Sequence, residues 1–177
     1  MTLAKAGTWT GTREEPHERL LIELEQREGQ ALFGFVRRLG LTDSEANDVV
    51  QEVFLRLWRQ LGSDGPLDNP KGWTYRTVYR LAMDQHRLRR RASALVGRLG
   101  GGSERDVSDR DDRIAVWSEV DRLPARQREV LYLRYRSDLP FEEIAAVLGI
   151  SSSAARSHAT QAMATLRRRF EPEDSTR

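Results

Sequence analysis

The chain has 177 residues, of which 32% are charged and 38% hydrophobic, and its formal net charge is +2. This composition fits one ordinary domain or two small amphipathic helical domains better than a large buried core. The lack of cysteine excludes disulfides, thiolate zinc sites and cysteine nucleophiles, and the lack of a long apolar run or signal core predicts a cytoplasmic protein without a membrane span.

Two helices are predicted in the first third of the chain. Residues 1–16 show no periodicity and are interpreted as a flexible leader. Apolar residues recur at helical spacing over 17–39, which predicts the first helix. Thr42 and Glu45 match a capping box, in which a hydroxyl and a carboxylate each bind a backbone N–H, so a second helix begins there. Its predicted buried stripe consists of Val49, Val50, Val53, Phe54, Leu57, Trp58 and Leu61.

A third helix is predicted after a loop of turn-forming residues at 62–69. Asn69 and Pro70 suit the N-cap and the first turn of this helix, which we expect to run to about Arg91. Between Lys71 and Arg91 seven basic residues accompany one acid, a local charge of +6. The aromatic residues interleaved with them are Trp73, Tyr75 and Tyr79. Aromatic faces for unpaired bases, flanked by arginines for phosphates, predict a surface for single-stranded or melting DNA. For Trp73, burial in the core is the favoured alternative.

A change of composition separates the two halves of the chain. Residues 93–112 contain four glycines and then turn acidic, which predicts a flexible linker. Helical patterning resumes near Asp109, restarts at Pro124 and again after Pro140. No run alternates strictly enough to predict a strand. We therefore expect an all-α fold of two small helical domains, each presenting its own charged surface to a partner.

The segment from Phe141 to Phe170 has the layout of a helix-turn-helix. Gly149 suits the left-handed turn, and Ser151 can cap the last helix. Helical spacing turns Ala155, Ala159, Ala162 and Leu166 toward the core. The opposite side, which could reach base edges and phosphates, carries Ser153, Arg156, Ser157, Thr160 and Gln161. The alternative is an alanine-rich helix of a plain bundle. Residues 167–169, three arginines, either bind phosphates or complement the helix dipole.

Taken together, the two halves resemble bacterial sigma factors of the extracytoplasmic-function type. Residues 48–54, Asp-Val-Val-Gln-Glu-Val-Phe, look like the polymerase-binding helix of that family's region 2. Residues 69–76, Asn-Pro-Lys-Gly-Trp-Thr-Tyr-Arg, look like its promoter-melting segment. Residues 123–131 and the helix-turn-helix after them resemble region 4. The resemblance assigns region 2 to 17–92, a linker to 93–112, region 4 to 113–170 and a tail to 171–177.

The resemblance implies a protein that has no catalytic residue, cofactor or metal and that binds promoter DNA and the β′ clamp and β flap of core RNA polymerase. The polymerase-binding residues would be Asp48, Gln51, Glu52 and Arg56. The −10 element would contact Asp68, Asn69, Lys71, Trp73, Tyr75, Arg76, Tyr79, Arg80 and Arg87, with a flipped base held in the 62–70 loop. The −35 element would contact Arg126, Ser153, Arg156, Ser157, Thr160 and Gln161. The linker would thread toward the polymerase cleft, and an anti-sigma factor is a further partner that the family implies.

His158 and Gln161 depart from the family, which usually has basic residues at these positions. Fewer fixed positive charges shift the preferred −35 bases, so the promoter sequence does not carry over. His158 flanks the packed face, where a structural role is expected. Two other functions stay open: a helix-turn-helix regulator whose N-terminal half senses a ligand or dimerises, and a metal-dependent nuclease in which Asp48 and Glu52 share a cation. The basic aromatic helix argues against the first, and the missing third ligand argues against the second.

Overall fold

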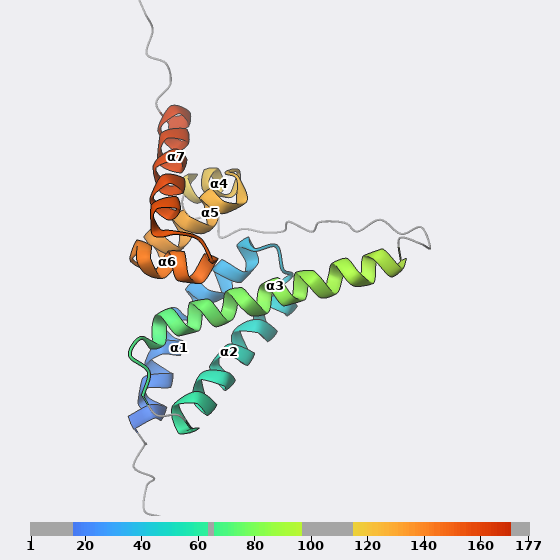
Figure 1. Ribbon diagram of the computed structural model, residues 1–177, viewed down its shortest axis with the longest axis vertical. Coiled ribbons are helices and arrows are strands. Elements are labelled where there is room, and N and C mark those ends of the chain that lie inside the picture. Colours follow the sequence, from blue (N-terminus) through green and yellow to red (C-terminus); the bar gives the residue numbers. More distant parts are fainter. Residues whose placement is uncertain (1–15, 64–65, 97–114, 171–177) are drawn as a thin grey trace, which may run out of the picture.

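The computed structural model describes residues 16–63, 66–96 and 115–170, which form helices and contain no strand (Figure 1). The N-terminal module consists of α1 (Pro16–Arg38), α2 (Asp43–Ser63) and α3 (Pro70–Val96). The C-terminal module consists of α4 (Ala115–Asp121), α5 (Ala125–Leu131), the π-helix η1 (Tyr132–Arg136), α6 (Phe141–Leu148) and α7 (Ser152–Phe170). The all-α prediction in two helical domains is confirmed. Residues 1–15 of the predicted leader, most of the predicted linker and the predicted tail lie outside the described residues, whereas Pro16 begins α1.

Side-chain caps fix three of the predicted helix starts. At α2 the capping box is complete, because the Thr42 N–H donates to the Glu45 carboxylate at 2.8 Å and the Glu45 N–H donates to Thr42 Oγ1 at 3.4 Å. At α3 the Gly72 N–H donates to Asn69 Oδ1 at 2.8 Å. At α7 the Ala154 N–H donates to Ser151 Oγ at 3.1 Å. Each cap satisfies a backbone donor that the first turn of a helix leaves unpaired.

Two elements differ from the predicted pattern. α3 continues to Val96, beyond the expected end near Arg91, since the next strong helix breaker is Gly97. The helix that begins after Pro124 does not stay regular, because its end widens into η1, where the Ser137 N–H donates to Tyr132 O at 3.2 Å. Such π-turns displace a side chain from the position that a regular helix would give it.

The two modules share one continuous core. In the N-terminal module Leu32, Phe35 and Leu57 are fully buried, and in the C-terminal module Leu133 and Ile144 are. The buried residues of both modules belong to a single packed cluster. Figure 1 shows α6 resting over the N-terminal half of α3, while the far half of α3 extends past the other helices. The modules are therefore packed against each other as well as joined by the chain.

No helix among the described residues is both long and apolar enough to cross a lipid bilayer.

Candidate functional site

The exposed side of α2 carries the residues predicted to bind a polymerase. Asp48, Gln51 and Arg56 are exposed, and Glu52 is half-buried. Arg56 Nε lies 2.7 Å from Glu52 Oε1, one helical turn away. The helix thus brings all four residues to one side, with charges of both signs next to each other.

Two large apolar side chains lie among these polar groups. Leu55 and Trp58 are each 50% exposed. Leu55 follows Asp48 by two helical turns, so the helical period alone could have placed it on this side. The prediction that Trp58 belongs to the buried stripe is wrong, because at 100° per residue it lies about 110° from the middle of that stripe. We call the surface of Asp48, Gln51, Glu52, Leu55, Arg56 and Trp58 the α2 face. An apolar centre with a polar rim is typical of protein–protein interfaces.

The first turns of α3 bury one residue that was predicted to contact DNA. Tyr75 is fully buried, its ring centroid lies 6.1 Å from that of Phe35, and its hydroxyl donates to Glu28 Oε2 at 2.9 Å. Burial also raises the pKa of this hydroxyl. No base can stack on a ring enclosed in this way, so the prediction for Tyr75 is wrong and its role is structural. The same Glu28 carboxylate pairs with Lys71 Nζ at 2.7 Å.

The remaining residues predicted to bind the −10 element form a partly exposed stripe along α3. Asp68, Arg80 and Arg87 are exposed, and Arg87 pairs with Asp84 at 2.8 Å. The half-buried members are Asn69, Lys71, Trp73, Arg76 and Tyr79. Trp73 packs against the core, as its favoured alternative predicted. Residues 64 and 65 of the loop predicted to hold a flipped base lie outside the described residues.

α7 presents the predicted polar side to solvent. Ser153, Arg156, Ser157, Thr160 and Gln161 are all exposed, and the alanines of the opposite side are buried. We call these five residues the recognition face. Gly149 has φ +65° and ψ 40°, the left-handed conformation required between α6 and α7. Helix, turn and helix therefore leave the recognition face free for a groove of duplex DNA.

Neighbouring side chains hold the recognition face in place. The Arg156 guanidinium pairs with Glu142 and lies 5.0 Å from the centre of the Phe141 ring. Gln161 accepts from Gln127 Nε2 at 3.4 Å, which ties it to the start of α5. Each contact limits the rotamers of a side chain that would have to be ordered on binding DNA.

Arg126, the sixth residue predicted to bind the −35 element, lies apart from α7 and contacts α3. Its Nη1 donates to Tyr79 Oη at 2.7 Å and lies 2.9 Å from Glu129 Oε2. His158 is half-buried and lies near the buried Glu129. In the basic end of α7, Arg169 pairs with Glu119 of α4 at 3.0 Å, which assigns that arginine to packing between helices.

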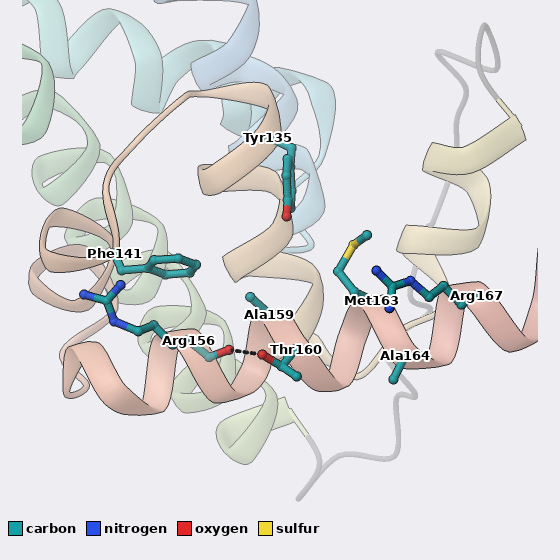
Figure 2. A pocket seen from close by; sticks show the side chains of 8 residues that line it. All are labelled: Tyr135, Phe141, Arg156, Ala159, Thr160, Met163, Ala164 and Arg167. Atoms are coloured by element: carbon teal, nitrogen blue, oxygen red, sulfur yellow. Dashed lines mark hydrogen bonds between the residues drawn. The ribbon is translucent and has the colours of Figure 1, made fainter.

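An apolar groove beside α7 was not predicted from the sequence. It consists of two adjoining recesses of about 490 and 350 Å³ that share Tyr135, Met163 and Arg167. Figure 2 shows the first recess, where Tyr135 and Phe141 stand over α7, and Arg156 and Arg167 mark its two ends. The second recess continues past Trp117 to Phe170. We call this surface the α7 groove. Tyr135 is 60% exposed and Phe170 is 47% exposed, so its walls are available to the apolar side of a partner.

The described residues offer no third ligand beside Asp48 and Glu52, because they contain no group of three histidine, aspartate or glutamate side chains able to hold a metal ion. Glu52 is instead engaged by Arg56. The nuclease alternative therefore gains no support from this part of the chain.

Each half of the chain matches the model of a known protein family. Residues 24–92 match the family model of sigma-70 region 2, and residues 113–166 match that of sigma-70 region 4. The RNA polymerase sigma factor CnrH of Cupriavidus metallidurans is 30% identical over 165 residues, which cover 85% of this chain and 86% of CnrH. The sigma factor SigV of Bacillus subtilis is 28% identical over 80% of this chain and 83% of its own length. The N-terminal half of the chain thus matches region 2 of a sigma factor. The match does not support the alternative of a regulator whose N-terminal half senses a ligand or dimerises.

Two solved structures share the fold. The sigma factor RpoE of Bartonella quintana, solved in complex with the anti-sigma factor NepR, superposes with a TM-score of 0.69 at 22% identity, covering 88% of this chain and 99% of RpoE. CnrH in complex with the cytosolic domain of CnrY superposes with a TM-score of 0.55 at 26% identity, covering 89% and 91% of the two chains.

Proposed function

Because this chain belongs to the extracytoplasmic-function group of the sigma-70 family, we propose that it binds core RNA polymerase and directs it to promoters through two separate DNA-reading surfaces. Members of this family are transcription factors rather than catalysts, so the polymerase performs the chemistry. The observation that carries the proposal is the ordered match of both halves to regions 2 and 4. Since polymerase and promoter DNA are cytoplasmic in bacteria, the protein acts in the cytoplasm.

The α2 face is the proposed contact with the β′ clamp of the polymerase. Leu55 and Trp58 supply an exposed apolar centre, and Asp48 and Glu52 supply charge at its rim. Buried apolar area provides most of the affinity of such an interface, and rim charges guide association.

Core binding tests this assignment. We expect Leu55→Asp, or charge reversal at Asp48 and Glu52 together, to weaken binding of purified core polymerase at least about tenfold, since a desolvated charge or a lost anchor costs about 1.4 kcal/mol or more. Glu25→Arg, a charge reversal on the exposed side of α1, is the matched control and leaves binding unchanged. Core binding that survives both α2 changes would assign the clamp to another surface.

The recognition face is the proposed reader of the −35 duplex. The Arg156 guanidinium, held by Glu142 and Phe141, suits a bidentate contact with guanine or a phosphate. We expect Arg156→Ala to lower affinity for −35 duplex DNA by about 1–3 kcal/mol, measured by fluorescence anisotropy, and to leave core binding unchanged. Loss of core binding instead would assign this face to the polymerase.

The stripe along α3 is the proposed surface for the −10 element. Arg76, Arg80 and Arg87 supply phosphate contacts at helical spacing, and Trp73 and Tyr79 supply the aromatic rings that remain after Tyr75 is assigned to the core. The loop of residues 62–70 is the proposed site for the flipped base, and the linker is proposed to thread toward the polymerase cleft.

The second recess of the α7 groove, which continues past Trp117 to Phe170, is the proposed site for the β flap. It is lined almost entirely by apolar atoms and runs along one helix, the shape into which the apolar side of a second helix fits. An anti-sigma factor is a further proposed partner, since RpoE was solved bound to one.

Reconstitution tests the proposal as a whole. Purified protein and core polymerase are expected to form a complex that starts transcription at a defined subset of promoters from a random DNA pool. Core polymerase alone is the control. If the protein does not co-purify with core polymerase, or does not change which promoters are transcribed, the proposed function is wrong.

A further inference from the structure

One side chain of the recognition face differs in hydrogen-bonding capacity from the other four. Gln161 ends in an amide, which has two N–H donors and an oxygen with two acceptor positions. Arg156 can only donate, and its guanidinium is paired with Glu142. The hydroxyl groups of the face carry one proton each, and Thr160 donates its proton to Arg156 O at 3.0 Å. Gln161 is therefore the residue of this face that can offer a base a donor and an acceptor on two adjacent atoms.

Two neighbours engage the Gln161 amide. Its Oε1 accepts from Gln127 Nε2 at 3.4 Å, and its Nε2 donates to Ser157 Oγ at 3.4 Å. Each contact uses one acceptor position or one donor, so one acceptor position and one donor remain. The count is the same if both amides are turned over, because the Ser157 hydroxyl can donate as well as accept. The remaining pair complements the edge that adenine shows in the major groove, where N6–H donates and N7 accepts.

Gln127 supplies the less mobile half of this arrangement. It lies in the first turn of α5, it is half-buried, and its Oε1 is enclosed by protein. An enclosed amide has few rotamers left, so Gln127 orients the exposed Gln161 amide before any base arrives, which lowers the entropy lost on binding. Contacts of 3.4 Å are long for hydrogen bonds, so the Gln161 amide can shift slightly toward a base without losing a strong bond.

The surface around Gln161 leaves room for a base edge. Ser157 lies about one turn before it and Ala164 about one turn after it, and both side chains are small and exposed. α7 contains no acidic residue, so no carboxylate of this helix repels the phosphates on either side of the groove. A duplex can therefore approach the amide closely enough for direct contact with a base.

We propose that Gln161 is a specificity-determining residue that reads one adenine of the −35 element, and that Gln127 positions its amide for this contact. The capacity of the amide rests on the contacts alone, whereas its use on promoter DNA rests on the proposed function. The other bases match it less well, because guanine presents two acceptors, cytosine one donor, and thymine one acceptor beside its methyl group. A two-point contact of this kind favours the matching base by about 5- to 150-fold.

The test measures base preference with the full chain bound to core polymerase. A promoter that this complex selects from a random DNA pool is prepared with each of the four base pairs at every −35 position, and binding is measured by fluorescence anisotropy. We expect one position at which wild type prefers adenine by at least about fivefold. Gln161→Ala should abolish the preference at that position alone. Gln161→Arg should change the preferred base there to guanine, which an arginine contacts at both O6 and N7.

Two substitutions of similar size test the positioning by Gln127. Gln127→Met removes the hydrogen bond and should reduce the preference for adenine by about two- to tenfold, because the Gln161 amide is then ordered only on binding. Gln127→Glu keeps an acceptor to which the Gln161 amide can donate, so it should retain most of the preference although its charge lowers the affinity for all four promoters. A residue that only packs α5 against α7 would change the four affinities together and leave their ratios unchanged.

Gln26→Arg, which adds the same charge as Gln161→Arg on the exposed side of α1, is the control and should leave every ratio unchanged. The assignment of Gln161 is wrong if Gln161→Ala changes no ratio, if the affected position prefers another base in wild type, or if Gln161→Arg still prefers adenine. The role of Gln127 is wrong if Gln127→Met leaves the preference intact or if Gln127→Glu loses as much of it. Failure of the proposed function differs from these results, since the wild-type complex would then not form or would show no base preference at any −35 position.

Discussion

Glu129 of α5 is a carboxyl group whose burial opposes its charge. The residue is 8% exposed, and burial raises its pKa although Arg126, Arg128 and His158 act in the opposite direction. A folded-state pKa above the unfolded value of about 4.5 means that the folded protein binds the proton more tightly. The contribution of Glu129 to stability is therefore complete below about pH 4.5 and is lost as pH rises through the folded-state pKa.

The variant Glu129→Gln keeps the shape and the acceptor oxygen but cannot ionise. We expect the free energy of unfolding of this variant, relative to wild type, to increase as pH rises from 4 to 8. Urea denaturation of both proteins at each pH measures it, and the difference cancels the other carboxylates. If the difference in free energy of unfolding between variant and wild type decreases over this range, then Arg126 lowers the pKa of Glu129 more than burial raises it.

The pKa of Glu45, at the start of α2, is shifted in the opposite direction. Burial alone would raise its pKa, but hydrogen bonds from the Thr42 N–H and hydroxyl and from the Arg89 guanidinium outweigh burial and lower it. Its contribution is thus present above the unfolded value of about 4.5 and is lost as pH falls through the folded-state pKa. We expect Glu45→Gln to cost about 1 kcal/mol at pH 7 and little at pH 3, in the same urea series. An equal cost at both values would assign the effect to the cap geometry and not to the charge.

Single residues are also where prediction from sequence was weakest. The helical period predicted correctly which side of α7 faces solvent, because three buried alanines and one buried leucine define the opposite side. The helical period places Trp58 outside the buried stripe of α2, so that error could have been avoided, whereas the enclosure of Tyr75 depends on the neighbouring helix. Tyr75 is buried against Phe35 and Glu28 of α1, whereas Trp58 is 50% exposed.

At the scale of the element, the turn between α6 and α7 depends on one backbone conformation. Gly149 has φ +65°, and a Cβ there would meet no atom within 4 Å. Gly149→Ala should therefore lower the free energy of unfolding only through the left-handed backbone, by about 1–2 kcal/mol. Gly62→Ala, also in open space but at a helical position, is the control and should be neutral or slightly stabilising. If urea denaturation shows the same change in the free energy of unfolding for both variants, a side chain at position 149 does not strain the turn.

Helix starts and the helix-turn-helix turn were predicted because each depends on residues three or four apart. The longer α3 and the π-turn at η1 were not. In η1 the Ser137 N–H bonds to Tyr132 O and the Leu139 N–H to Leu133 O, a pattern with no counterpart in the composition of the segment. The wider turn accompanies the insertion of Tyr132 into the other module, which is a tertiary contact and invisible to local patterns.

The prediction of two domains identified the helices of each but not their packing. The hydrogen bond from Tyr132 to Ala31 O joins residues 101 positions apart, and glycine at position 34 reads in the sequence only as a weak helix former. A Cβ at Gly34 would lie 2.5 Å from Tyr132 Oη, and this close fit can be recognised only from the three-dimensional structure. Modules that share buried surface stabilise each other. The single core therefore predicts how the whole molecule unfolds.

Wild-type protein should therefore unfold in one calorimetric transition although it has two modules. Gly34→Ala should uncouple the modules and give two transitions, with the less stable module melting roughly 5–10 °C lower, as expected when a module of under 100 residues loses about 1–2 kcal/mol. Gly29→Ala should keep one transition at an equal or slightly higher temperature, since it adds helix propensity without a clash. Two transitions in the wild type would mean that the contact through Tyr132 adds too little free energy to couple the cores.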